Sequence, residues 1–406
     1  MENKRFLKIF ASESEYNSQK DTVMGEPHVV YLEDTQTVVY KGIEGGNDEP
    51  SEPSEPEVDY SKEYFTIEFV EDGKFQLDYS LSGSGSTVVE YNYNNQGWME
   101  LTPNAEGAFS TKANDTVQLR AINDYWGSIQ SSMFSSIEGK FNVKGNIMSL
   151  LYAEDFEGQT DLSGMNYVFE YLFYNCNNLV NAKDLVLPAT TLAENCYSYM
   201  FAGCTSLTTA PELKATILAN GCYSNMFNGC TSLTTTPELH ATTLADYCYF
   251  SMFANTNVLP DCSNIDFTSE SVVASGGLKG LFTSTKVTDS DLMQILPLND
   301  EGKYCLPATI LANGCYSNMF AGCTSLTTAP ELPATTLAYS CYTNMFYGCS
   351  KLNYIKMLAT NISASYCLNN WVYGVASNGT FVKNANMTSL SNGVNGIPSG
   401  WTVENA

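Results

Sequence analysis

Residues 222–239 read CYSNMFNGCTSLTTTPEL, and residues 315–332 read CYSNMFAGCTSLTTAPEL. Only two of the eighteen aligned positions differ between the two stretches. A chain that repeats a segment this closely builds the same local structure each time, so this repeat decides the fold. Each copy also contains two cysteines eight residues apart, a pattern that could indicate a metal site, a redox pair or a disulfide.

The repeat has a period of 26 residues, which is the spacing from Cys196 to Cys222. Two degenerate copies place Val168 and Gly277 at the position of the first cysteine, and a further copy would begin at Ile129. The first cysteines of the complete copies are Cys196, Cys222, Cys248, Cys315, Cys341 and Cys367. Periods of 20 to 50 residues are typical of solenoids, in which each unit buries its apolar face against its neighbours.

Within one unit, apolar residues between Ala219 and Cys230 recur with the spacing of an amphipathic helix of two to three turns. Asn220 lies where an N-cap is expected, and Gly229 lies where a C-cap is expected. The Thr- and Leu-rich SLTTAPEL and PATTLA segments read as a short strand, a turn and a return segment. We therefore predict an α/β solenoid with units of about 26 residues, each a strand plus a short helix, which is the plan of leucine-rich repeats.

The cysteine pairs are predicted to be structural. Two cysteines eight apart on one helix lie roughly 12 Å apart along its axis, which is too far for a disulfide. Equivalent cysteines of neighbouring units would stack instead into internal columns, as small buried hydrophobes. Some lateral disulfides remain an alternative, whereas zinc is disfavoured because the repeats carry no CxxC motif and the chain has only two histidines. The predicted core cysteines are Cys196, Cys204, Cys222, Cys230, Cys315, Cys323, Cys341 and Cys349.

The chain is predicted to have five parts. HVVYLEDTQTVVYKG alternates apolar and polar residues like a hairpin of His28–Leu32 and Thr37–Tyr40, and alternating runs separated by turn residues follow the linker. The parts are 1–42, an anchoring or oligomerisation segment; 43–60, an acidic Pro-rich linker; 61–125, a small all-β, sandwich-like domain; 126–375, the solenoid; and 376–406, a C-terminal cap.

The repeats contain one irregular stretch, 257–304, because Gly277 and Cys315 are 38 residues apart instead of 26. Insertions in repeat arrays project from one face and often form the variable contact surface. The equally weighted alternative is a bulge without a binding role that contains a short helix at about Asp289–Ile295.

Composition excludes several classes of function. The formal net charge of −25 argues against nucleic acid or an anionic membrane surface as a partner. No stretch approaches 18 apolar residues, so no membrane-spanning helix is expected. No GxSxG, HExxH or phosphate-binding glycine motif occurs, and we expect no catalysis, metal or cofactor. A depolymerase built from acidic residues that converge in space is a minority alternative.

The motif CYxxMFxGCTSLTTAPELPATTLA resembles BspA-like leucine-rich-repeat proteins, a group of Bacteroidetes surface proteins that also occurs in their phages. The resemblance covers roughly residues 126–406, and it includes NVKGNIMSLLYAEDFEG and the C-terminal segment, which look like the caps of that family. It implies adhesion and ligand binding rather than catalysis, and it transfers no fixed binding residues.

RFLKIFASESEYNSQKDTVMGEPHVVYLEDTQTVVYKG resembles the N-terminal segment of virion proteins from gut Bacteroides phages, including crAss-like phages. The resemblance implies attachment to other virion proteins through residues 1–42, and we expect a homo-oligomer, with a trimer favoured. The N-terminus has too short an apolar run for a secretory signal, so we expect no export by that route. This agrees with a protein made in the host cytoplasm and displayed on the virion surface. The alternative location is the bacterial cell surface, as an adhesin of the same repeat family.

Tyrosine and threonine recur at fixed positions of the repeat. Aromatic rings flanked by hydroxyl groups suit binding of sugars or proteins. The alternatives are that the tyrosines pack between units and that the threonines are ordinary strand surface. The candidate ligand-binding residues are Tyr197, Tyr223, Tyr249, Tyr316, Tyr342, Thr208, Thr209, Thr234, Thr235, Thr327 and Thr328. We therefore predict a non-enzymatic structural and binding protein, a phage head or tail appendage or decoration that adheres to a host-surface glycan or protein.

Overall fold

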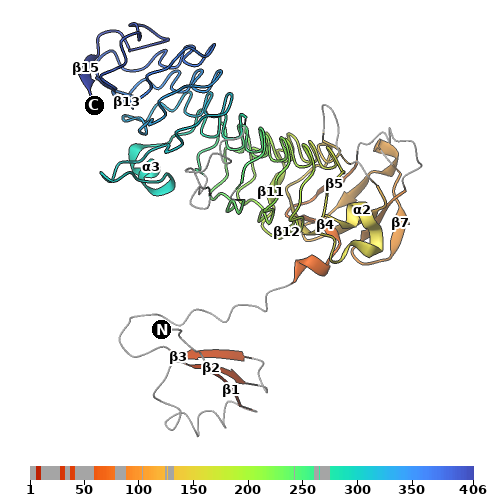
Figure 1. Ribbon diagram of the computed structural model, residues 1–406. Helices are drawn as coiled ribbons and strands as arrows, with labels where there is room; N and C mark the ends of the chain where they lie inside the picture. Colours follow the sequence, from red (N-terminus) through yellow and green to blue (C-terminus); the bar gives the residue numbers. More distant parts are fainter. Residues whose placement is uncertain are drawn as a thin grey trace. The chain divides into compact units, whose positions relative to one another are not determined.

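The computed structural model describes the strand backbones 6–10, 28–32 and 37–41 and residues 59–77, 88–102, 104–123, 126, 132–241, 243–259, 265 and 275–406 (Figure 1). The chain forms two compact units, Met1–Asp59 and Tyr60–Ala406. Most of the predicted linker, residues 43–58, lies outside the described part, and so does Ile129 of the predicted ninth repeat.

The first unit contains a three-stranded sheet of β1 (Phe6–Phe10), β2 (His28–Leu32) and β3 (Thr37–Lys41). β2 and β3 pair antiparallel, with Val30 opposite Val39, in agreement with the predicted hairpin. β1 pairs parallel to β2. The sequence analysis did not identify β1, because parallel pairing joins distant segments and leaves no local turn signal.

The second unit begins with a mixed sheet in the order β11-β10-β4-β9-β6-β7, in which β12 also pairs with β10. Side chains of a strand point alternately to the two faces of its sheet. In β9, accordingly, Val117, Leu119 and Ala121 are buried while the residues between them are not. Its strands are β4 (Phe65–Phe69), β6 (Val89–Tyr93), β7 (Trp98–Glu100), β9 (Thr116–Ala121), β10 (Phe141–Asn146), β11 (Leu179–Asn181) and β12 (Leu185–Val186). Within the predicted domain 61–125 the strands of this sheet pair antiparallel. The sheet extends beyond that range, because β10 pairs antiparallel with β4 and parallel with β11 and β12.

Short elements complete this region. β5 (Gly73–Phe75) and β8 (Phe109–Thr111) form a separate two-stranded sheet. The buried Ser149 hydroxyl accepts from the Phe65 amide and donates to the Leu119 carbonyl, at 2.9 and 3.0 Å, so it ties one short helix to two strands of the sheet. The helical elements are η2 (Tyr60–Lys62), η3 (Asn104–Gly107), α2 (Ser149–Tyr152) and η4 (Ala153–Phe156).

The repeats are built from runs of consecutive turns. In each run three residues spaced four apart have positive φ, as at Gly221, Asn225 and Gly229 with φ of 61°, 55° and 78°. In the described residues such runs begin at Tyr167, Asn195, Gly221, Tyr247, Gly276, Gly314, Ser340 and Tyr366. Glycine and asparagine occupy most of the left-handed positions because these residues tolerate positive φ best.

Hydrogen bonding within a run alternates along the chain. The amide of Met200 donates to the carbonyl of Tyr197 three residues back, at 3.2 Å, and closes a turn with left-handed Tyr199 in its third position. The amide of Tyr197 donates instead to Cys222 of the next run, at 3.0 Å. Half of the amides in each run are therefore satisfied only by the neighbouring run, and successive runs stack along the second unit (Figure 1).

The predicted α/β solenoid of leucine-rich repeats is wrong. The described residues form mostly strands and turns, and α2 and α3 are the only α-helices among them. A left-handed residue at every fourth position prevents an α-helix, which needs negative φ throughout. Gly229, predicted to be a helix C-cap, is the last left-handed residue of its run. The strand predicted for each repeat is reduced in most of them to single parallel bridges, such as Thr209 with Thr235.

The irregular stretch and the C-terminal end contain the remaining regular elements. The short helix predicted at about Asp289–Ile295 is confirmed as α3 (Asp289–Ile295), which begins with a capping box between Thr288 and Asp291. β13 (Tyr354–Met357), β14 (Thr380–Lys383) and β15 (Thr402–Asn405) form a parallel three-stranded sheet near the C-terminus.

Replacement of Gly314 distinguishes the turn stack from a helix. Gly314 has φ of +63°, and an added Cβ would meet no atom within 4 Å. Gly314→Ala should therefore lower the free energy of unfolding by about 1 kcal/mol through backbone strain alone, whereas in a helix the same change would raise it by about 1 kcal/mol. Gly314→Asn is the matched control and should lie between glycine and alanine, because asparagine tolerates this conformation. Urea unfolding followed by circular dichroism measures all three proteins, and a more stable alanine variant would contradict the turn stack.

Candidate functional site

The interior of the turn stack is lined by aromatic ladders. Phe173 stacks on Phe201 with ring centroids 5.2 Å apart, and Phe201 stacks on Phe227 at 5.5 Å. A parallel ladder joins Tyr197 to Tyr223 at 5.8 Å. Offset stacked rings attract beyond the apolar area that they bury. The ladders therefore fix the register between successive runs and give the repeat region a rigid frame.

The predicted tyrosine ligands form part of this interior. Tyr197, Tyr223, Tyr249, Tyr316 and Tyr342 are all buried, at 2% exposure or less. Burial raises the pKa of the ring hydroxyls of Tyr197, Tyr223, Tyr316 and Tyr342. The structure therefore brings these five rings together in columns, as the packing alternative required, and a ligand at the surface would not reach them.

The eight predicted core cysteines are buried and unpaired, and so are the other four described cysteines. In the four copies that have a second cysteine, its thiol bonds across the stack; these are Cys204, Cys230, Cys323 and Cys349. The thiol of Cys230 donates to the carbonyl of Phe201 at 3.1 Å, and the thiol of Cys349 donates to Phe320 at 3.0 Å. Burial raises the pKa of the Cys230 thiol to about 12, so it stays protonated at neutral pH. No lateral disulfide occurs among the described cysteines.

The predicted threonine rows lie partly at the surface. Thr234 and Thr235 are exposed, whereas Thr208, Thr209, Thr327 and Thr328 are half-buried. The hydroxyl of Thr208 donates to the Val180 carbonyl, and that of Thr234 donates to the Thr208 carbonyl, both at 2.9 Å. These hydroxyls donate hydrogen bonds between neighbouring repeats, as expected if the threonines are ordinary strand surface.

A different set of tyrosines faces solvent. In the run that begins at Ser340, the two residues after Ser340 and the two after Asn344 are buried, whereas Tyr347, which precedes the next left-handed residue, is exposed. Tyr347 stacks on Tyr373 of the next run at 4.9 Å, and Tyr339 meets Tyr366 edge to face at 5.9 Å. All four are more than 40% exposed. We call Tyr339, Tyr347, Tyr366 and Tyr373 the exposed tyrosine cluster.

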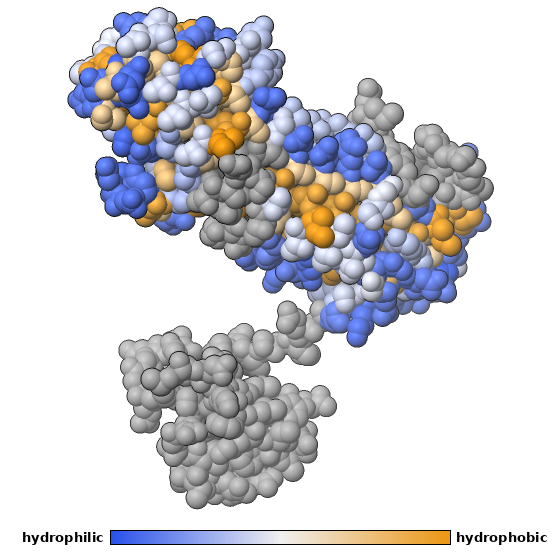
Figure 2. Space-filling model, viewed as in Figure 1, coloured by the Kyte–Doolittle hydropathy of each residue, from blue (hydrophilic) through white to orange (hydrophobic). Residues whose placement is uncertain are grey.

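The sequence analysis missed this cluster because it counted positions along a helix. The glycine and asparagine residues at every fourth position were the available signal for the true period. The space-filling view shows apolar side chains in a band between hydrophilic margins on the visible face of the second unit (Figure 2). The repeat region thus presents apolar surface to solvent as well as burying it.

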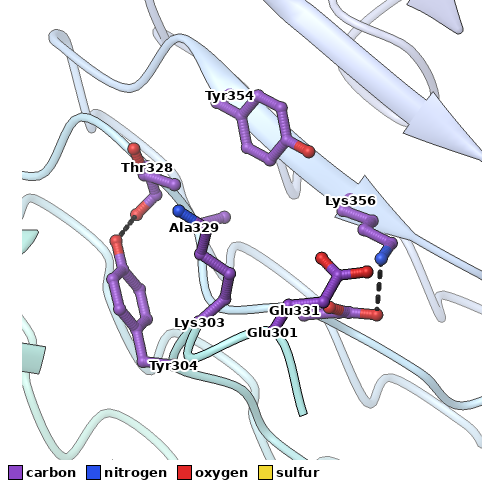
Figure 3. Close-up of a pocket in the computed structure, with 8 residues that line it drawn as sticks. All are labelled: Glu301, Lys303, Tyr304, Thr328, Ala329, Glu331, Tyr354 and Lys356. Carbon is purple, nitrogen blue, oxygen red and sulfur yellow. Dashed lines mark hydrogen bonds and ion pairs between the residues drawn. The ribbon is translucent and has the colours of Figure 1, made fainter. Parts of the chain in front are cut away.

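A pocket opens where the irregular stretch meets the following repeats, and it encloses about 400 Å³. Three successive segments of the stack contribute its walls (Figure 3). The lining residues are Glu301, Lys303, Tyr304, Thr328, Ala329, Glu331, Tyr354 and Lys356. Of these, only Thr328 was among the binding residues predicted from the sequence.

Hydrogen bonds hold the walls of this pocket in place. Asp289 at the start of α3 accepts from the amides of Thr327 and Thr328, at 2.9 and 3.2 Å, and fixes the irregular stretch to the next repeat. The Tyr304 hydroxyl donates to the Thr328 carbonyl at 2.8 Å. Burial and the nearby Asp289 charge raise the pKa of Tyr304, so its ring stays neutral.

Glu331 organises the polar side of the pocket. One carboxylate oxygen lies 3.0 Å from the Lys356 ammonium, and the other accepts from the Asn299 amide group at 2.6 Å. The side-chain carbonyl of Asn299 in turn accepts from the backbone amides of Glu301 and Lys303, at 3.0 and 2.9 Å. The hydrogen bond to Glu331 raises the pKa of Lys356, which therefore stays charged at neutral pH. The loop that carries two of the lining charges is thus attached to the pocket wall.

Two further features bear on the class of site. No helix in the described part of the chain is long and apolar enough to cross a membrane. Within the same residues, no group of three or more His, Cys, Asp or Glu side chains is arranged to hold a metal ion.

The buried thiols predict the reactivity of the folded protein toward a thiol reagent. The twelve described cysteines should not react with Ellman's reagent at pH 8, because they are buried and protonated. All thirteen should react after denaturation. Cys262 lies outside the described residues, so the matched control is Cys262→Ser, which should show no reactive thiol before unfolding. Titration of two or more reactive thiols in the folded wild-type protein would contradict the closed interior.

Comparison of the chain with protein-family models, with curated proteins and with solved structures finds no match.

Proposed function

We propose that this protein is a non-enzymatic adhesion protein, displayed on a phage virion, whose repeat region binds a glycan or protein on the host surface. The observation that carries the proposal is the exposed tyrosine cluster on a frame made rigid by internal ladders. Large aromatic surfaces that a protein leaves in water at high density are typical of binding sites. Tyrosine gives much contact area for little loss of side-chain entropy, because it has few rotatable bonds.

The arrangement of the cluster supports contact with an extended partner. Stacking of Tyr347 on Tyr373 holds both rings in one orientation before a ligand arrives. Preorganisation of this kind lowers the entropic cost of binding. Each tyrosine pair joins the same two successive repeats, so a chain-like glycan or an extended peptide could cross from one repeat to the next along the stack.

The placement on a virion rests on the first unit and on the resemblance of its sequence to phage virion proteins. Strands β1 and β3 are the outer strands of its sheet, and each leaves one edge that no described strand covers. Uncovered edges favour pairing with another chain. We propose that residues 1–42 join copies of this protein, as a trimer, and attach them to other virion proteins. A cell-surface adhesin is the second candidate, and the resemblance of the repeats to BspA-like surface proteins supports it.

Deletion of residues 1–42 tests this placement. The deletion should convert the oligomer to a monomer in light scattering. In immunogold microscopy of a lysate, antibody against the repeats should label particles carrying the full chain and leave those carrying the deletion unlabelled. The matched control is the full chain with an epitope tag after Ala406. Gold on the cell envelope alone, or an oligomer that survives the deletion, would contradict the virion assignment.

Replacement of the stacked pair tests the adhesion surface. Tyr347→Ala combined with Tyr373→Ala should weaken adhesion to the host cells at least tenfold, because central aromatic residues contribute a large share of binding energy. Tyr167→Ala and Tyr247→Ala together form the control, since these rings are similarly exposed but belong to earlier runs. Binding of fluorescently labelled protein to cells is the measurement, with thermal unfolding as a check on the fold. Equal loss in both double variants would contradict a localised site.

A further inference from the structure

We infer that the pocket lined by Glu301, Lys303, Tyr304, Glu331, Tyr354 and Lys356 is a binding site for an uncharged pyranose sugar. The inference deepens the proposed function, on which it rests, by naming the class of ligand and a second contact site. The pocket differs from the exposed tyrosine cluster in that it is a hollow of about 400 Å³ with four charged side chains in its lining, and three of its eight lining residues come from the irregular stretch.

The first argument is the charge of the lining. Glu301 and Glu331 balance Lys303 and Lys356, so the pocket carries no net charge. The chain as a whole has a formal net charge of −25, which repels anions at long range. An anionic ligand would have to overcome this field, and a cationic ligand would meet two ammonium groups. An uncharged ligand with many hydroxyls avoids both penalties.

The second argument is the supply of hydrogen-bonding groups. The Lys356 ammonium has three donors, and its pairing with Glu331 leaves others for a ligand. Glu301 and Lys303 are exposed and have no ion-pair partner among the described residues. Sugar hydroxyls both donate and accept, so neighbouring hydroxyls of one ring can bond to a carboxylate and to an ammonium at the same time.

The third argument is the pair of aromatic rings. Tyr304 and Tyr354 both line the pocket, and they lie on different segments of its wall (Figure 3). Tyr304 is held by its bond to the Thr328 carbonyl, whereas Tyr354 is half-exposed. The flat apolar faces of a pyranose ring pack against aromatic rings. Tyr354 is the more accessible of the two rings, because Tyr304 is only 6% exposed. A volume of about 400 Å³ lies in the range of small-molecule sites.

The site is also preorganised without a ligand. Asn299 links the loop of Glu301 and Lys303 to Glu331, and Asp289 holds α3 against the threonine row. Prior fixation of the binding groups reduces the entropy lost on binding. A peptide partner is a weaker interpretation, because peptides bind along an exposed strand edge or an extended groove, whereas these residues line one hollow of about 400 Å³.

The test uses the full chain and three uncharged trisaccharides, made of glucose, mannose and galactose units, with a sialylated trisaccharide as the acidic comparison. Saturation-transfer NMR and isothermal titration measure binding to the wild type and to Lys303→Gln and Tyr354→Leu. We expect at least one uncharged trisaccharide to bind, and each substitution to weaken that binding tenfold or more. The matched controls are Lys351→Gln and Tyr167→Leu, which change exposed residues outside both the pocket and the exposed tyrosine cluster and should leave binding unchanged.

The other outcomes overturn the inference. They are an absence of saturation transfer from all three uncharged sugars at millimolar concentration, tighter binding of the sialylated sugar, and equal losses in pocket and control variants. Attachment to host cells that survives periodate but is lost after protease treatment of the cells, with no sugar bound at the pocket, would assign a protein partner instead. Sugar binding at the pocket without particle labelling would refute the virion role and leave the pocket assignment intact.

Discussion

The repeat region depends on one constraint, which is that every second backbone amide of a turn run needs an acceptor in the next run. Tyr197 donates to Cys222, and Tyr223 donates in turn to Cys248. An isolated run would leave these amides without protein partners, and an unpaired buried amide costs about as much as a lost hydrogen bond. A single repeat therefore has no stable form of its own, and the stack must be continuous.

The side chains of the interior follow from this spacing. Runs joined by backbone hydrogen bonds bring equivalent residues within stacking distance. A residue type that packs well at one position of a run therefore packs well at the same position of the other runs. Phenylalanine and tyrosine form ladders, and cysteine fills the smaller positions, where its thiol donates to a carbonyl of the preceding run. Near the C-terminus Trp371 stacks on Tyr342 and meets Phe381 edge to face, so a larger ring continues the ladder toward the closing sheet.

The contrast between inward and outward positions explains where binding residues can vary. Inward positions are fixed by the ladders, whereas outward positions and the irregular stretch carry no such requirement. The exposed tyrosine cluster uses the outward positions of the last repeats, and the pocket uses the irregular stretch between Gly277 and Cys315. Asp289 shows how the additional residues are attached, because it bonds to the threonine row, which elsewhere only joins repeats.

The sequence by itself determined the 26-residue register, the burial of the repeat cysteines, the hairpin of β2 and β3 and the helix α3. Each has a local or periodic signal, such as the capping box at Thr288. Only the tertiary structure decided between helix and turn run, and therefore which tyrosines face solvent. Over the span from Cys222 to Cys230, inward residues at Cys222, Tyr223, Met226 and Phe227 suit a period of 3.6 as well as a period of four. A helix and a turn run differ in the acceptors of their backbone amides, because every second amide of a turn run donates to the next run. The sequence of a single repeat does not reveal that acceptor.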